Sequence, residues 1–164
     1  MSRSIRCLLL VAAWGLIGCA AARSVEPGVS EDRTGGIRLE MLVKTPDNAL
    51  SHYRIETTGT IKYGGGLDVI QGSFSWSDAM TDEEIETLRS LLDAYQWFSR
   101  TPAASGEPEK LRRTVSVAGP PGRNQFEVIG ECAEVSEVQE LLEKITSRRL
   151  DTVLDALPQP GLQP

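Results

Sequence analysis

The sequence predicts an α+β fold, in which strand hairpins form an antiparallel sheet and two amphipathic helices pack on one of its faces. Several short segments alternate apolar and polar residues at period two, and turn residues separate them. Two longer segments carry apolar residues at helical spacing, as a single stripe each. Each stripe needs a sheet face against which it can be buried. The predicted order is β-β-β-α-β-β-α.

The first strands are predicted over residues 37–45, 52–58 and 60–63. Apolar residues occupy every second position of the first strand, which indicates that one of its faces is buried. In the second strand Tyr53 and Ile55 are expected to face the core, whereas His52 is expected to face outward as a surface residue. Residues 46–48, with the sequence Pro-Asp-Asn, and Gly59 supply the turns.

Residues 64–66 are three glycines, which predict a further turn. An anion cradle is the alternative interpretation, but no lysine-bearing helix start follows these glycines. Residues 67–76 alternate less cleanly, and we expect an extended segment there with a bulge at Gly72.

The first helix has the clearest start in the domain. Thr81 and Glu84 have the spacing of a capping box, and Asp82 and Glu83 place negative charge at the positive end of the helix dipole. Pro102 prevents any continuation of the helix. The apolar stripe consists of Ile85, Leu88, Leu91, Leu92, Tyr95 and Phe98.

The second half repeats the pattern of strands followed by a helix. Residues 111–117 and 125–130 are predicted to form a hairpin around residues 119–122. Its outer face carries Arg112, Thr114 and Glu127. Residues 136–139, with the sequence Ser-Glu-Val-Gln, predict a second capping box. The stripe of the closing helix loses register across residues 147–149, so a bend is expected there.

The N-terminal segment is typical of a secretory signal peptide. Arg3 and Arg6 precede an uncharged apolar run, residues 7–17, which is too short to span a membrane. The run ends in Leu16, Ile17, Gly18 and Cys19, which resemble the lipobox of bacterial lipoproteins. This resemblance implies that Cys19 becomes the first mature residue and carries acyl chains that anchor it in a membrane of the bacterial cell envelope, facing the periplasm or the exterior. Cleavage elsewhere, for example after Ala22, would instead release a soluble protein.

These features divide the chain into four parts. Residues 1–18 are the predicted leader, and residues 19–36 contain the lipidated cysteine and a flexible tether rich in Pro, Gly, Ser and acidic residues. Residues 37–157 form a single predicted α+β domain. Residues 158–164 are a tail.

Charge and cysteine content limit the partners. The chain has 17 basic and 23 acidic side chains, and loss of Arg3 and Arg6 with the leader makes it more acidic still. An acidic surface argues against nucleic acid and against adhesion to anionic lipid, so we expect another envelope protein as partner. Apart from Cys19, Cys132 is the one cysteine left after cleavage, which excludes a disulfide within the mature chain. A structural thiol is expected, with a redox role as the alternative.

The sequence contains no recognised catalytic motif and a single histidine, so we expect no enzyme activity, no metal of the zinc type and no small-molecule cofactor. Carboxylates gather near the first helix start, at Asp78, Asp82, Glu83, Glu84 and Glu86. Helix capping accounts for them. The alternatives are a calcium site, or an envelope enzyme with a pocket that holds two carboxylates of raised pKa.

A binding patch is a further hypothesis. The candidate residues are Trp76, Trp97, Tyr63 and Arg112, because aromatic residues and arginine concentrate in interfaces. The aromatic residues could equally form the core. Arg112 belongs to a basic group with Lys110 and Arg113, which is either a solvated strand face or a docking site for an acidic partner.

From Ile37 to about Leu157 the domain resembles the emfourin-like proteins, small bacterial inhibitors of thermolysin-type metalloproteases. The layout carries this resemblance: an opening hairpin, a capped helix ending in Trp97-Phe98, a second hairpin, and a closing helix with Leu141-Leu142. Residues 59–63 also resemble a hairpin turn of uncharacterised lipoprotein domains. The resemblance implies a protein-binding role, with protease inhibition as a specific form of it. No inhibitory motif is matched, so no inhibitory residue is transferred.

Overall fold

The computed structural model of this chain describes residues 31–103 and 111–155. The leader, the lipobox with Cys19, Lys110 and the tail therefore lie outside the described residues. Six strands form one antiparallel sheet in the order β4-β3-β2-β1-β5-β6. The strands are β1 (Arg38–Lys44), β2 (Leu50–Ile55), β3 (Thr60–Gly65), β4 (Trp76–Ala79), β5 (Arg112–Gly119) and β6 (Gly122–Ile129).

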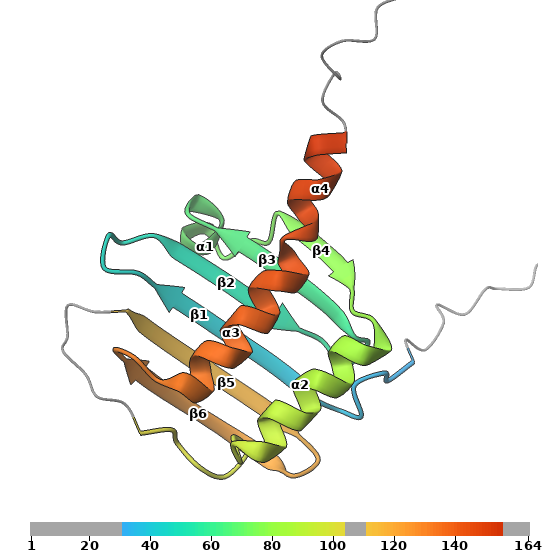
Figure 1. The fold of residues 1–164 in the computed structure, drawn as a ribbon, viewed down its shortest axis with the longest axis vertical. Coiled ribbons are helices and arrows are strands. Elements are labelled where there is room, and N and C mark those ends of the chain that lie inside the picture. The colour runs from blue at the N-terminus through green and yellow to red at the C-terminus, as the bar shows by residue number, and fades with distance from the viewer. Residues whose placement is uncertain (1–30, 104–110, 156–164) are drawn as a thin grey trace, which may run out of the picture.

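Two helices lie across the same face of this sheet, α2 (Asp82–Ala94) and α3 (Ala133–Thr146) (Figure 1). A short helix, α1 (Leu67–Gln71), follows β3, and α4 (Arg148–Asp155) continues beyond α3 and past the sheet. This arrangement confirms the predicted α+β class. The break at Ser147 also confirms the bend predicted in the closing helix. No helix of the described ranges is both long and apolar enough to cross a membrane.

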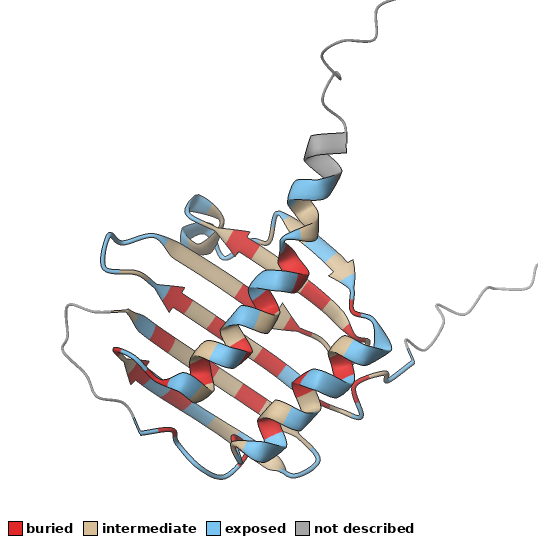
Figure 2. Cartoon of the chain, in the orientation of Figure 1, coloured by how far each residue is buried: buried red, intermediate tan, exposed pale blue. Residues whose placement is uncertain are grey.

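The hydrophobic core lies between the sheet and these two helices (Figure 2). Alternate residues of the central strand β1, such as Leu39 and Met41, are buried against α2 and α3. Leu88 and Leu92 of α2 and Leu142 of α3 complete the layer from the helix side. The one-sided burial explains why each helix needs a single apolar stripe.

Residues 67–76 differ from the extended segment that the sequence predicts. Residues 67–71 form α1, which buries none of its side chains, and Leu67 and Ile70 are 71% and 72% exposed. Gly72 ends this helix with a left-handed φ of 67°, so it is a helix cap and not a bulge. Only residues 76–79 continue the sheet, as edge strand β4.

The two predicted capping boxes have different outcomes. At α2 the box is present: Thr81 Oγ1 accepts from Glu84 N, and Glu84 Oε2 accepts from Thr81 N. The second prediction is wrong, because α3 begins at Ala133 and Ser136 lies inside it. Ser136 Oγ instead accepts a hydrogen bond from Arg113, at 3.1 Å.

The predicted tether boundary also needs correction, since the ordered body begins before Ile37. Thr34 is buried, and its hydroxyl donates to Ile37 O at 2.8 Å. Arg89 of α2 donates to the carbonyl oxygens of Thr34 and Arg33, at 3.2 and 3.1 Å. The segment that precedes β1 is therefore fastened to α2.

Candidate functional site

The sheet face opposite α2 and α3 carries polar and charged side chains, and we call it the open face. It presents the residues of each strand that alternate with the core positions. In an antiparallel sheet one face can be solvated in this way. A hollow of about 450 Å³ lies on this face, with Arg38, Arg54 and Arg123 in its lining.

Strand register explains where the hollow lies. Ala118 of β5 is opposite Arg38 of β1 and opposite Arg123 of β6. Residues directly opposite one another in a sheet project to the same face. The Ala118 methyl group therefore lies between the long side chains of Arg38 and Arg123, which leaves a depression in the surface at that point. Thr57, Thr58 and Ser116 add hydroxyl groups to the lining.

Glu40 and Glu56 also line the hollow, and both are held by basic side chains. Glu40 Oε1 accepts from His52 Nε2 at 2.7 Å and from Arg54 at 2.9 Å. Partial burial alone would raise the pKa of Glu40, but the hydrogen bonds from Arg54 and His52 outweigh it and lower that pKa. Glu56 accepts from Lys62 at 2.5 Å.

Arg38 and Arg123 are exposed and make no hydrogen bond or ion pair with any residue that the structure describes. The other arginines of the described ranges all donate to an acceptor or pair with a carboxylate: Arg33, Arg54, Arg89, Arg100, Arg112, Arg113, Arg148 and Arg149. The two unpaired guanidinium groups thus both belong to the hollow.

Phe74 covers one corner of the open face. Its ring centroid lies 4.8 Å from that of His52, and Arg54 Cζ lies 4.7 Å from it. His52 does face outward, as predicted, but its side chain is only 14% exposed, because Phe74 and Glu40 enclose it. Glu40 and Arg54 line the hollow, and His52 supports Glu40 from outside that lining.

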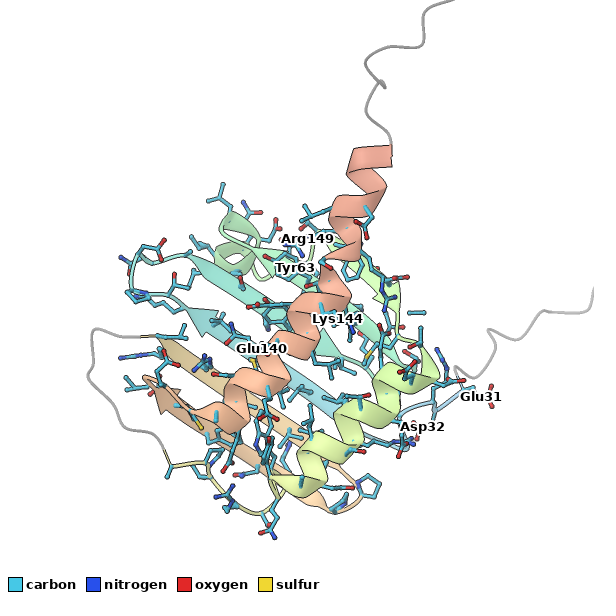
Figure 3. All side chains as sticks on the ribbon, viewed as in Figure 1. Glu31, Asp32, Tyr63, Glu140, Lys144 and Arg149 are labelled. Atoms are coloured by element: carbon cyan, nitrogen blue, oxygen red, sulfur yellow. The ribbon has the colours of Figure 1, made fainter. Side chains whose placement is uncertain are left out.

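The structure does not bring the four predicted binding residues together. Trp97 is 0% exposed and packs edge-on against Phe126, so its place in a surface patch is wrong. Tyr63 and Trp76 are half-buried on the helix side of the sheet, where Arg149 Cζ lies 4.2 Å from the Tyr63 ring (Figure 3). Arg112 alone reaches the open face, and it pairs with Glu127 at 3.4 Å.

Most of the acidic residues near the start of α2 are engaged in structural contacts. Arg148 donates to Asp78 at 2.9 Å and to Glu84, and Asp82 pairs with Arg33 at 2.6 Å. Partial burial alone would raise the pKa of Glu84, but the hydrogen bonds from Arg148 and Thr81 outweigh it and hold that pKa below its usual value. The catalytic alternative requires a raised pKa at such a carboxylate. Within the described ranges no group of three or more His, Cys, Asp or Glu residues could hold a metal ion.

No family model and no curated protein matches this chain. The candidate site is therefore defined by the geometry of the open face.

No sequence pattern groups Arg38, Ala118 and Arg123. Period two does place Arg38 on the polar side of the first strand. The pairing of β1 with β5, more than 60 residues later in the chain, is a tertiary contact that no local pattern encodes. The sequence pattern therefore predicts the face on which Arg38 lies, but it does not predict that Arg38, Ala118 and Arg123 are neighbours.

Proposed function

We propose that this protein is a membrane-anchored lipoprotein of the bacterial envelope, and that its domain binds a partner protein through the open face without catalysing a reaction. The hollow with its two unpaired arginines is the observation that supports this proposal. Arg38 and Arg123 make no hydrogen bond or ion pair with a described residue, whereas the remaining described arginines are all engaged. Arginine is also among the residues that contribute most to binding at interfaces.

The anchor would fix where this binding takes place. The lipobox resemblance implies acyl chains on Cys19, and two or more such chains hold a protein stably at a membrane. A binding domain held in that way meets other envelope proteins at a raised effective concentration. A small, polar recognition site can then be sufficient.

In-cell photocrosslinking tests the proposal. A benzophenone amino acid replaces Gln125, which is exposed on the open face opposite Ser116. The matched control places it at Glu140, which is exposed on α3 (Figure 3). We expect a crosslinked adduct with a discrete envelope protein from position 125 and none from position 140. No adduct at 125, or the same adducts at both positions, would show that the open face is not the binding surface.

A further inference from the structure

The two unpaired arginines stand on either side of one small residue. Arg38 and Arg123 are each directly opposite Ala118. Directly opposed Cα atoms in antiparallel strands lie about 5 Å apart, so the two arginine Cα atoms are about 10 Å apart. Both side chains are long enough to lean over the Ala118 methyl group. The hollow over Ala118, which both arginines line, has room for a group of a few atoms.

The donors around that space suit a carboxylate. A guanidinium group offers its N–H donors as a planar fork that matches the two oxygens of an anion such as carboxylate or phosphate. Ser116 lies two residues from Ala118 on the same face and in the same lining, and its hydroxyl makes no hydrogen bond to another residue of the described ranges. The site thus combines the guanidinium groups of Arg38 and Arg123 with the hydroxyl group of Ser116, which is a neutral donor.

The surroundings distinguish between anions. Glu40 and Glu56 line the same hollow, and the whole chain has a net charge of −6. A phosphate-rich polymer or an anionic bilayer would bring several negative charges against those carboxylates. A peptide that carries one acidic side chain among neutral residues brings only one. Its backbone N–H groups can in addition donate to Glu40 and Glu56.

Given the proposed binding function, we infer that the hollow is a carboxylate-recognition site for an acidic side chain of a peptide segment from the partner protein, with Arg38 and Arg123 holding its two oxygens. The ligand is a single aspartate or glutamate in a neutral context. This inference rests on the proposed function and names the chemistry of the group that the open face recognises.

Titration with a defined peptide tests the inference. The probe is an acetylated and amidated peptide, Gly-Ser-Gly-Glu-Gly-Ser-Gly, and its counterpart has Gln in place of Glu. The full-length lipidated protein in detergent micelles is followed by NMR of the arginine Nε–H groups. We expect the Glu peptide to shift the signals of Arg38 and Arg123, and the Gln peptide to leave them in place.

Variants identify the groups responsible. Arg38→Gln and Arg123→Gln are each expected to weaken binding of the Glu peptide about tenfold, because each removes a charge-assisted pair of hydrogen bonds. Ala118→Leu fills the hollow without changing the charge and should abolish binding. Arg112→Gln is the matched control, since Arg112 lies on the same face outside the hollow. It should bind as the unchanged protein does, and thermal unfolding verifies that all variants fold.

Each contrary outcome has a distinct meaning. Equal binding of both peptides, no binding of the Glu peptide, or loss of binding in Arg112→Gln alone would overturn the carboxylate site. Vesicles of anionic phospholipid that shift the same signals more strongly than the peptide would overturn its ligand class. If the crosslink from position 125 persists in any of these cases, the proposed binding function stands without this inference. If the peptide binds but the crosslink is absent, the proposed partner fails instead.

Discussion

Arg113 is the clearest example of a single side chain that organises its surroundings. It lies on the core side of β5 and is 3% exposed. It donates to Gln139 Oε1 at 2.5 Å, to Gly130 O at 3.1 Å and to Ser136 Oγ at 3.1 Å. Burial lowers the pKa of Arg113, while Glu131, Cys132 and Glu143 oppose that shift. A buried guanidinium with three neutral acceptors thus ties β5 to α3.

We expect Arg113→Lys to destabilise the protein by about 1–3 kcal/mol, because an ammonium group cannot reach the three acceptors in the geometry of the planar fork and leaves buried polar atoms unsatisfied. The adjacent Arg112→Lys is the matched control, since Arg112 is exposed on the other face of the same strand. A change within about 0.5 kcal/mol is expected there. Urea unfolding measures both, and equal effects of the two substitutions would contradict this role.

The position of Arg113 could have been predicted from the sequence. Residues 113, 115 and 117 share one face of a strand, and Val115 and Val117 are core residues. Residue type alone predicts a surface position for Arg113 beside Arg112, because charged residues are seldom buried, and that prediction is wrong for Arg113. The alternation of buried and exposed positions along the strand determines where Arg113 lies, although the residue is charged. Ser136 and Gln139 make this burial possible because they supply hydrogen-bond acceptors. Ser136 lies inside α3, so its hydroxyl is available to Arg113 and does not cap the helix.

At the scale of elements, the start of α2 is joined to the start of α4. Glu84 closes the capping box with Thr81 and also accepts from Arg148. Arg148 donates in addition to Asp78 Oδ2 and to Ala79 O, at 2.9 and 3.2 Å. A residue from the last described helix thus binds β4 and α2 together, although it follows the nearest residue that it contacts, Glu84, by 64 residues.

Because the pKa of Glu84 is lowered in the folded state, its ionised form stabilises the protein above the ordinary pKa of a glutamate. That contribution is lost as the pH falls through the lowered pKa. We expect Glu84→Gln to cost about 1–2 kcal/mol near neutral pH. The difference from the unchanged protein should shrink on acidification below about pH 4, the ordinary range for glutamate.

Glu83→Gln is the matched control, as Glu83 is exposed in the same first turn. It should cost only a few tenths of a kcal/mol through the helix dipole. Thermal or urea unfolding at several pH values gives both quantities. A loss at Glu84→Gln that does not vary with pH would show that the carboxylate charge is not what stabilises this junction.

Sequence patterns predicted correctly the elements that are determined by residues close to one another in the chain. The strands near residues 37–63, the hairpin of β5 and β6, and the capped start of α2 all lie close to their predicted positions. Residues 67–76 were predicted less well, because Leu67 and Ile70 are apolar residues without a sheet face to cover them. The short helix α1 between Gly66 and Gly72 replaces the extended segment, and none of its side chains is buried.

At the scale of the whole molecule, the described chain begins beside α2, and the two long helices, α2 and α3, lie on the same face of the sheet (Figure 1). Arg33 and Thr34 form hydrogen bonds and an ion pair with residues of α2, so the segment before β1 is bound to the body of the domain. The candidate site combines β1, β2, β5 and β6. A site that depends on the pairing of strands distant in sequence cannot be read from period and motif alone, which is why the sequence patterns do not group these residues.

The proposed anchor depends on the thiol of Cys19. If Cys19 carries the lipid, Cys19→Ser will not incorporate a clickable palmitate analogue, because a serine hydroxyl cannot form the thioether. The mature lipidated band should disappear from the membrane fraction, leaving an unprocessed precursor or a released product. Cys7→Ser and Cys132→Ser are matched controls, since one lies in the leader and the other is buried in the domain. Both should keep the label, whereas a Cys19→Ser product that remains in the membrane at the size of the unchanged mature protein would show that another feature holds it there.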